Sequence, residues 1–338
     1  FFVVRAVSAE ATYEGRHKNK AGLQRLWRHE FWPPWALHLP VLPVIVWNAL
    51  RRGPMTFTCS NPGIQIAGGW IGESKSLILR HLVRSMKSGD TPNPNQVAHF
   101  VYIPEGPDPG VRASQVIDAV KHDAALAGYP IVLKPDHGRH GHGLTVAQND
   151  EEVRTYFQTM PRAVIAQRSI HQPHEVSILW SRQPNHAGPM DDAPGEILSI
   201  TRKRFPVIEG DGVKPLDHLI WDHPRFQMQA PVFLDRLGKD AERVPAKGEA
   251  VSLGLSGDHR QGAMYVEATD LLTPELRQAI ERLAQEFQDE KGERLDFASF
   301  DIRFTSEEAM KRGEGLTVLT VRGSPSEPAE VYLAERTL

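Results

Sequence analysis

The sequence predicts an α/β (α+β) protein in which short apolar strands alternate with amphipathic helices. Residues 131–135 and 297–304 are strand-like runs bounded by turn-forming or glycine-rich segments. Apolar residues at helical spacing mark residues 73–86 and 274–290 as helices. A length of 338 residues with a hydrophobic fraction of 40% is enough for two domains, or for one large unit, with a substantial hydrophobic core.

Capping residues delimit three predicted helices. Ser114 is expected to cap a helix that Gly128 ends. Asn149 is expected to cap a short helix through Phe157, and Pro274 stands at the first position of a long one. Further strands are predicted at residues 99–103, 144–147, 163–170, 176–180, 197–204 and 316–321.

Charge and cysteine usage narrow the class of protein. The 39 basic and 42 acidic residues give a formal charge of −3, so nothing electrostatic favours a nucleic-acid partner. The single cysteine, Cys59, cannot pair within the chain, which indicates a reducing, cytoplasmic location, and we expect a small buried thiol there. The chain begins at Phe1 without Met, as expected of a piece of a longer protein, and nothing in it indicates an oligomeric state.

An apolar run from Phe31 to Leu50 with basic flanks is long enough that it could contact or span a membrane. About 20 apolar residues can span a bilayer, but prolines interrupt this run and His38 would be costly in hydrocarbon. Its prolines and tryptophans are Pro33, Pro34, Pro40, Pro43, Trp32, Trp35 and Trp47. Tryptophans near basic ends are typical of an interfacial segment. A buried core or short broken helices, peripheral or interfacial contact and a membrane span stay open, in that order of preference, and no signal-peptide cleavage pattern follows.

The strongest local signal is a strand that ends in a lysine and leads into a glycine-rich loop. Lys134 precedes Gly138, Gly141 and Gly143, and a second strand follows. Glycines let backbone N–H groups approach a phosphate closely, and the lysine adds a point charge. The lysine precedes the glycines, so this is not a Walker A loop, and no G-x-G-x-x-G opens a helix, so it is not a Rossmann fingerprint. A phosphate-binding loop and a plain glycine-rich turn both remain open.

Three histidines, His137, His140 and His142, lie in the same loop. Histidines at such spacing can chelate a metal ion, but no cysteine or carboxylate clearly completes the set. We therefore expect them either to donate hydrogen bonds to a phosphate or to have no binding role in the loop.

The order of motifs between Glu73 and about Glu330 resembles that of the ATP-grasp superfamily. The resemblance is to carboxylate–amine ligases such as D-alanine–D-alanine ligase and the ATP-grasp part of cyanophycin synthetase. In chain order the matching segments are Glu73-Ser74-Lys75, Val132-Leu133-Lys134-Pro135 with the loop glycines, Val164 to Ile170, His174-Glu175-Val176-Ser177, Ile200 to Arg204, Gly210-Asp211-Gly212, Leu253 to Gly262, Tyr265 to Asp270 and Phe300-Asp301-Ile302-Arg303. The resemblance implies an ATP-grasp fold, with two α+β subdomains that grip ATP and an additional N-terminal lobe.

The same resemblance divides the chain into three predicted segments. Residues 1–95 would form the N-terminal lobe with the Trp/Pro-rich run, residues 96–175 the lid subdomain with the glycine-rich loop, and residues 176–338 the C-terminal catalytic subdomain. Within the last segment, residues 221–250 show no regular pattern and are predicted to be irregular.

The resemblance also implies a set of residues that bind ATP. Two lysines would hold its phosphates, the glycine loop would close over them, the backbone of residues 168–170 would face adenine, and Glu175 would bind the ribose hydroxyls. The implied ATP-binding residues are Lys75, Lys134, Gly138, Gly141, Gly143, Gln167, Arg168, Ile170 and Glu175. Taken alone, Lys75 could equally be an exposed helix lysine, and Glu175 an ordinary acid at a strand edge.

Three basic residues are implied in catalysis. Arg202, Lys203 or Arg260 would stabilise an acyl phosphate and the tetrahedral adduct formed from it. The alternatives are a solvated run of charges at residues 202–204 and a plain loop arginine at Arg260.

The magnesium site is where the sequence departs from the family pattern. Asp301 matches the first Mg²⁺ ligand, but the closing strand, which carries Glu-x-Asn in the family, has Thr320 and Arg322. Magnesium prefers oxygen ligands, whereas arginine adds positive charge. Four explanations stay open: Glu327 or Glu330 is a substitute ligand, Arg322 itself neutralises phosphate, phosphoryl transfer is lost, or the alignment is shifted.

These implications favour an ATP-dependent ligase that joins a small-molecule carboxylate to an amine or similar nucleophile, with ATP and Mg²⁺ as cofactors. The carboxylate would attack the γ-phosphate of ATP to give an acyl phosphate and ADP, and the amine would then displace phosphate. The alternative is a nucleotide-binding module with weakened or lost catalysis. A third hypothesis is a membrane-associated domain whose working surface is the apolar run.

Overall fold

The structure is a computed structural model, and it describes residues 13–54, 60–65, 67–70, 72–88, 96–138, 141–183, 193–254, 257–324 and 328–334. Cys59, His140 and Glu327 lie outside these ranges, so the expectations about them stay predictions.

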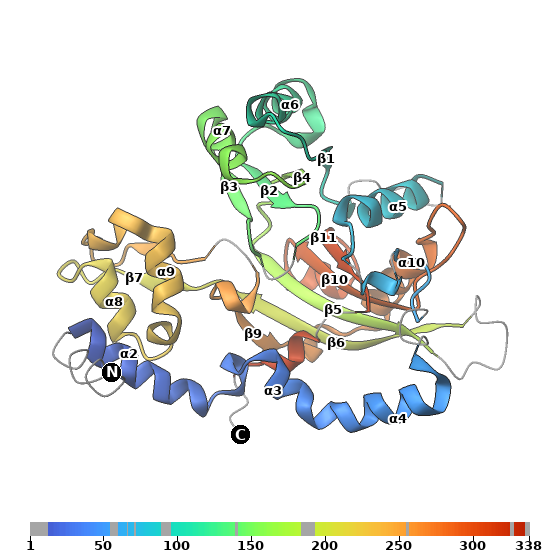
Figure 1. The fold of residues 1–338 in the computed structure, drawn as a ribbon, viewed down its shortest axis with the longest axis horizontal. Coiled ribbons are helices and arrows are strands. Elements are labelled where there is room, and N and C mark those ends of the chain that lie inside the picture. The colour runs from blue at the N-terminus through green and yellow to red at the C-terminus, as the bar shows by residue number, and fades with distance from the viewer. Residues whose placement is uncertain are drawn as a thin grey trace. The chain divides into compact units, whose positions relative to one another are not determined.

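The chain forms two compact units, which Figure 1 colours by position along the sequence. The smaller unit contains Phe1–Pro43, Lys203–Val266 and Ala329–Leu338, and the larger unit contains Val44–Arg202 and Glu267–Pro328. These bounds differ from those of the three predicted segments, whose division stays a prediction. A unit assembled from separate stretches of chain leaves no local signal of composition at its boundaries.

The larger unit contains an antiparallel sheet with the strand order β1-β4-β2-β3. Its elements are β1 (Phe100–Ile103), β2 (Ile131–Pro135), β3 (Thr145–Ala147), β4 (Val164–Arg168), α6 (Pro109–His122) and α7 (Asp150–Thr159). The two helices pack against each other and against this sheet (Figure 1). Buried side chains such as Leu133 and Phe157 form their common core.

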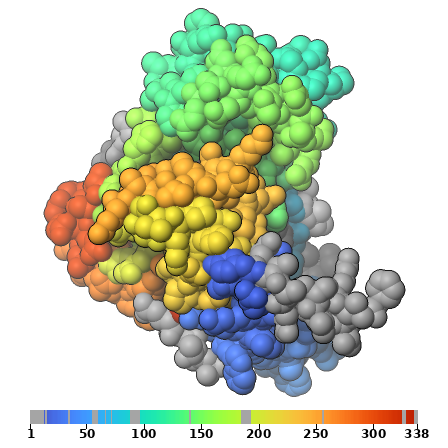
Figure 2. All heavy atoms as spheres, turned by 90° about the vertical axis from the view of Figure 1, so that its left-hand side faces the viewer, coloured from blue at the N-terminus to red at the C-terminus, as the bar shows by residue number. Residues whose placement is uncertain are grey.

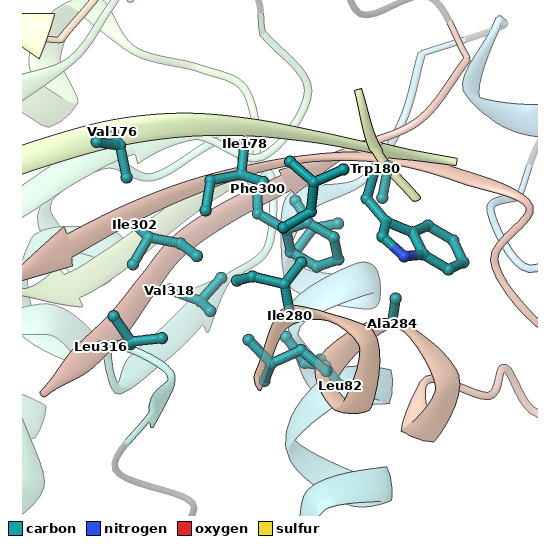
Figure 3. Close-up of a cluster of buried hydrophobic side chains, with 14 of the residues drawn as sticks. Leu82, Val176, Ile178, Trp180, Ile280, Ala284, Phe300, Ile302, Leu316 and Val318 are labelled. Carbon is teal, nitrogen blue, oxygen red and sulfur yellow. The ribbon is translucent and has the colours of Figure 1, made fainter. Parts of the chain in front are cut away.

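A second sheet of the larger unit holds β11, β10, β5 and β6 side by side in that order. The elements are α5 (Lys75–Ser88), β5 (His174–Arg182), β6 (Gly195–Arg204), α10 (Pro274–Glu286), β10 (Phe297–Phe304), α11 (Glu307–Lys311) and β11 (Leu316–Arg322). Every second strand residue points to the same face. Ile178, Phe300 and Val318 therefore meet Leu82 of α5 and Ile280 of α10 in one buried cluster (Figure 3).

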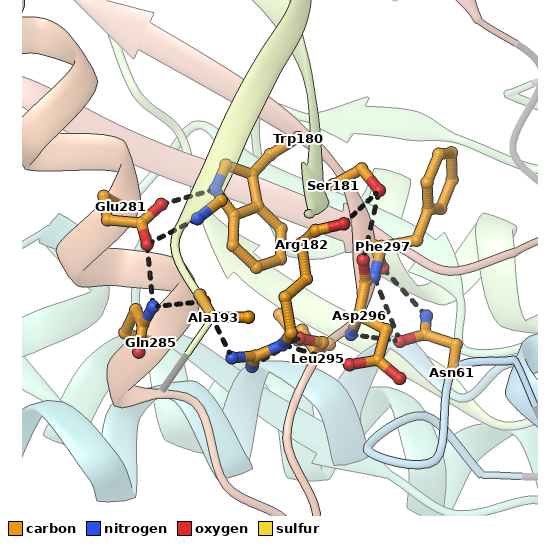
Figure 4. A network of polar contacts seen from close by, with 11 residues as sticks. Asn61, Trp180, Ser181, Arg182, Ala193, Glu281, Gln285, Leu295, Asp296 and Phe297 are labelled. Atoms are coloured by element: carbon orange, nitrogen blue, oxygen red, sulfur yellow. Dashed lines mark hydrogen bonds and ion pairs between the residues drawn. The ribbon is translucent and has the colours of Figure 1, made fainter. Parts of the chain in front are cut away.

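A network of polar contacts holds β5, β10 and α10 together at one end of this sheet (Figure 4). The buried guanidinium of Arg182 forms an ion pair with Asp296 at 3.0 Å. The indole of Trp180 donates to Glu281 at 2.7 Å, and Asn61 donates to the backbone at the start of β10 at 2.8 Å. Buried polar groups need such partners, so the network fixes where the two strands begin and end.

The smaller unit is built mainly from short helices around a core of its own. Its elements are α2 (Tyr13–Leu26), α3 (Pro34–His38), β7 (Val207–Glu209), α8 (Leu216–Asp222), α9 (Ala230–Leu237), β8 (Ala250–Ser252) and, for most of its length, β9 (Met264–Glu267). Trp221, Phe226 and Phe233 lie in this core. Figure 2 shows the side chains of the segment that carries them, in yellow and gold, closely packed.

Two local predictions are wrong. Residues 221–250 are not irregular, because α9 lies within them, with Pro231 near its start and Gly238 just after its end. A helix this short shows no clear period. The helix expected from Ser114 to Gly128 begins instead at Pro109, because the Asp108 carboxylate accepts hydrogen bonds from two backbone N–H groups of the first turn. It also ends earlier, at His122, and a separate 3₁₀ helix follows it.

The apolar run forms a chain of short helices. These are the 3₁₀ helix at His29–Phe31, α3, the 3₁₀ helix at Leu39–Val41 and α4 (Leu42–Arg52). The prediction of helices broken near prolines is confirmed, but the prediction of a buried run is wrong, because Val44, Trp47 and Leu50 are exposed. None of the helices in the described ranges combines the length and the apolar character needed to cross a membrane.

Candidate functional site

Lys134 lies near the end of β2, opposite Ile165 of β4. Its Nζ donates to the side-chain oxygen of Gln167 at 2.8 Å and to the backbone oxygen of Leu319 at 3.2 Å. The residue is only 9% exposed. Burial, followed by the charge of Lys75, lowers the pKa of Lys134 to about 7, because a charged amine is costly away from water. Both hydrogen-bond acceptors are neutral, so an anion beside this amine would be stabilised.

Gln167 is buried on β4 and orients the Lys134 amine. Its Nε2 donates to the backbone oxygens of Ala98 and Leu319, at 3.2 Å each. The resemblance implies a nucleotide contact for Gln167. The structure shows a side chain that joins β4 to β11 and supplies an oxygen to Lys134.

Lys75 is the first residue of α5, and its amine contacts the backbone at the start of the glycine-rich loop. Nζ donates to three backbone oxygens, those of Pro135 at 3.1 Å, Asp136 at 3.0 Å and Gly138 at 2.7 Å. Burial lowers the pKa of Lys75 to about 8, against the opposing effect of Glu73 and Asp136. The side chain is thus not an exposed helix lysine, and it holds the loop close to the helix.

Asp136 is a structural residue that the sequence reasoning missed. Its carboxylate is buried and accepts from the Ser74 hydroxyl and the Ser76 backbone N–H, both at 2.7 Å. The ring of His137 lies 3.4 Å from the same carboxylate. Asp136 therefore ties the end of β2 to the first turn of α5. A serine flanking the helix start and an aspartate directly after a strand were the available signals.

Glu175 on β5 pairs with a residue that the sequence reasoning did not single out. Arg303 lies opposite Glu175 across the β5–β10 pair, and its Nε donates to Glu175 Oε2 at 3.1 Å. The same guanidinium donates to the backbone oxygen of Ile170. Glu175 is nearly buried, so it is not an ordinary acid at an exposed strand edge.

Asp301 and Arg322 form an ion pair between β10 and β11. Arg322 Nη2 lies 3.0 Å from Asp301 Oδ1 and 3.4 Å from the Ser299 hydroxyl. Thr320 stands opposite Asp301 in the strand register, and its buried hydroxyl has no hydrogen-bond partner. The first magnesium ligand implied by the resemblance is therefore already paired with a cation.

The loop glycines meet different requirements. Gly143 has φ +75°, and a Cβ there would lie 2.7 Å from Met160 Cε and 2.9 Å from Pro135 Cγ, so only glycine fits. At Gly138 a Cβ would lie 3.8 Å from the Lys75 amine. The backbone of Gly138 thus passes close to the Lys75 amine, to which it presents its carbonyl oxygen.

Of the three basic residues implied in catalysis, Arg202 belongs to the same unit as these lysines. Arg202 forms ion pairs with Asp270 at 2.7 Å and Glu307 at 2.9 Å. Lys203 and Arg260 belong to the smaller unit, so their part in the site stays a prediction. On β4, Arg168 is exposed and its backbone N–H donates to the oxygen of His99.

The residues of the larger unit fit the phosphates of ATP but not a magnesium ion at Asp301. Two enclosed amines beside a glycine-rich loop suit an anion. A divalent cation would compete with Arg322 for the Asp301 carboxylate, and Thr320 adds only a neutral hydroxyl. In the ranges that the structure describes, no three His, Cys, Asp or Glu side chains gather into a metal-binding group. Glu330 belongs to the smaller unit.

Curated relatives with the name cyanophycin synthetase are similar to part of this chain, whereas no family model matches it. The relative from Geminocystis herdmanii is 24% identical over 213 residues, covering 56% of this chain and 22% of the relative. The relative from Trichormus variabilis is 26% identical over 192 residues, covering 52% of this chain and 20% of the relative. The chain thus spans about a fifth of the length of the curated relatives it matches.

Among solved structures, two enzymes share a loose likeness with the chain. A bifunctional glutathione synthetase from Pasteurella multocida has a TM-score of 0.34 at 16% identity, covering 75% of this chain and 32% of that one. D-alanine–D-alanine ligase from Bacillus anthracis has a TM-score of 0.38 at 11% identity, covering 74% of this chain and 56% of that one. With TM-scores this low, the assignment depends on the sequence relatives and on the order of motifs. The chain is therefore similar to ATP-grasp enzymes of the carboxylate–amine ligase kind.

Proposed function

We propose that this chain is an ATP-dependent ligase that joins a small-molecule carboxylate to an amine or similar nucleophile. The observation that carries the proposal is the pair of enclosed amines, Lys75 and Lys134, beside the glycine-rich loop. Burial disfavours the charged form of both amines, and a nearby anion would stabilise that charged form. The triphosphate of ATP is such an anion. The likeness to cyanophycin synthetases supports a ligase.

The proposed reaction has two steps. One carboxylate oxygen of the substrate attacks the γ-phosphorus of ATP, and ADP leaves with the bridging oxygen. The amine nitrogen then attacks the acyl carbon, phosphate leaves, and the nitrogen loses its proton to solvent. Such transfers depend mainly on positioning and on charge stabilisation. We assign Lys75 and Lys134 to phosphate oxygens, Glu175 to the ribose, and the stabilising role to Arg202, Lys203 or Arg260.

The first test is nucleotide binding by the Lys134→Ala variant. A ligand that binds only the folded state stabilises it, by about 2.7 kcal/mol at a free concentration of 100 times Kd. We expect the wild type to show a thermal shift with millimolar ATP and Lys134→Ala to show none. Lys121→Ala, which changes an exposed lysine on α6, should keep the wild-type shift. A wild type without any shift would contradict the proposal.

A nucleotide-binding module without catalysis is the second candidate function. The ion pair between Asp301 and Arg322 favours it, because a paired carboxylate is a poor metal ligand. Formation of ADP, measured with a panel of small carboxylates and amines, separates the two candidates. ADP that requires an acid, and that accumulates over many turnovers when an amine is also present, indicates the ligase, and bound ATP without any ADP indicates the module.

We further propose a cytoplasmic chain that contacts a membrane surface peripherally through α4. Val44, Trp47 and Leu50 are exposed on this helix, and its last turn carries Arg51 and Arg52. Exposed apolar side chains next to basic ones suit the interface of an anionic bilayer.

A further inference from the structure

The Asp301–Arg322 ion pair stands where the family resemblance implies a bound magnesium ion. We infer that the Arg322 guanidinium takes over the charge-neutralising role of a divalent cation, so that the chain binds the phosphates of a nucleoside triphosphate without Mg²⁺. This inference rests on the proposed binding of ATP. It goes beyond that proposal by naming the group that faces the phosphate and the ion that binding does not need.

The strand pair β10–β11 holds the guanidinium in place. Ser299 lies opposite Arg322, and Asp301 lies opposite Thr320. Alternate residues of a strand share a face, so Arg322 reaches diagonally to Asp301, at 3.0 Å, and also to the Ser299 hydroxyl, at 3.4 Å. Both strands are packed on the main core of the larger unit, which gives the arginine a rigid support.

The donor set at this position suits a cation poorly. Asp301 is already neutralised by Arg322, and the guanidinium would repel a metal ion beside it. The Thr320 hydroxyl is neutral and lacks the charge that would offset this repulsion. A metal ion would therefore have to break the ion pair before it could use the carboxylate.

The same position suits an anion. The charge of Arg322 is among those that lower the pKa of Lys75, and the charge of Lys75 is among those that lower the pKa of Lys134, so Lys75 lies within electrostatic reach of both other cations. The Arg322 side chain is 30% exposed and that of Asp301 is 12% exposed, so the guanidinium is the more accessible member of the pair. A guanidinium can bind two phosphate oxygens at once.

Calorimetric titration with ATP, once in EDTA and once in excess Mg²⁺, tests the inference. We expect the wild type to show about the same Kd under both conditions. Arg322→Asn removes the cation and places an amide oxygen near Asp301. We expect this variant to lose at least about tenfold in affinity in EDTA, because a charge-assisted contact is lost, and to regain most of it in Mg²⁺. Arg312→Asn, at an exposed arginine of the same unit, should behave as the wild type.

The two titrations distinguish failure of Mg²⁺-independent binding from failure of ATP binding itself. A wild type that binds ATP only with Mg²⁺ overturns the inference and leaves the proposed function intact. A wild type that binds ATP under neither condition defeats the proposed function itself. If Arg322→Asn does not fold, as judged by circular dichroism, Arg322→Lys keeps the charge and should retain binding in EDTA, and loss of that binding in a folded Arg322→Lys protein would count against the inference.

Discussion

Individual amines in the larger unit carry charges that depend on pH near neutrality. Lys134 donates to neutral oxygens in an enclosed site, and Lys75 donates to three backbone oxygens. Burial is the largest cause of the lowered pKa of both amines. A phosphate would reverse this effect, since an adjacent negative charge favours the protonated amine.

Affinity for ATP should therefore fall as the pH rises above about 7, the pKa of Lys134 in the free chain. The protonated amine attracts phosphate and the neutral amine does not, so one titrating lysine raises Kd by up to about tenfold per pH unit. Calorimetry at about pH 6 to 9, in buffers of different ionisation enthalpy, should show proton uptake on binding. Affinity that stays constant over this range would show that neither lysine contacts the phosphates.

At the scale of the elements, the position of the capping side chain determines where a helix begins. Asn149 accepts from the backbone N–H of Glu152 at 3.0 Å, which confirms the predicted cap of α7. In α6 an aspartate before a proline takes this role, and Ser114 lies inside the helix, exposed to solvent. A serine within an amphipathic pattern is thus a weak signal when a stronger cap precedes it.

Asp108→Ala should lower the free energy of unfolding by about 1 kcal/mol, the usual cost of losing a cap. Ser114→Ala should change it little, because the exposed hydroxyl lies within the helix. Urea denaturation of both variants checks this pair. Equal losses would mean that Asp108 contributes nothing as a cap.

The proposed membrane contact also depends on a single element, α4. Replacing Trp47 and Leu50 together by serine should abolish co-sedimentation of the full chain with anionic vesicles, because both side chains are exposed there. Leu198→Ser, at an exposed leucine of β6, is the matched control and should leave co-sedimentation unchanged. If the double variant still binds vesicles, or the wild type binds none, the membrane proposal fails.

At the scale of the whole molecule, contacts between side chains far apart in the sequence join the separate stretches of chain that make up a unit. In the smaller unit the guanidinium of Arg225 makes two contacts of 2.7 Å with the Glu30 carboxylate, although 195 positions separate the two residues. Glu30 is buried. The pair joins two of the three stretches of chain that form this unit.

Glu30→Ala should lower the free energy of unfolding by about 3–5 kcal/mol, because it leaves Arg225 as an uncompensated charge in a buried site. Glu242→Ala, at an exposed glutamate of the same unit, should cost less than about 0.5 kcal/mol. Chemical denaturation measures both. A small effect of Glu30→Ala would mean that water readily reaches the arginine.

Much of the fold could be predicted because it depends on local pattern. The strands at residues 131–135, 297–304 and 316–321 agree with β2, β10 and β11 to within a residue. The place of Lys134 at the end of a strand before the glycine-rich loop was also readable from the sequence, whereas the enclosure of Lys75 was not. The two units could not be predicted in the same way, since each is assembled from stretches that lie far apart in the sequence.

The sequence by itself determined the alternation of strands and helices, the glycine-rich loop and the lysine that precedes it, because each is set by residues close together in the chain. Only the tertiary structure decided which side chains these groups meet. Gln167 reaches Lys134, Arg303 reaches Glu175 and Arg322 reaches Asp301 through strand pairing. Pairing is fixed by the order and register of strands in a sheet, and that order depends on the packing of the whole unit.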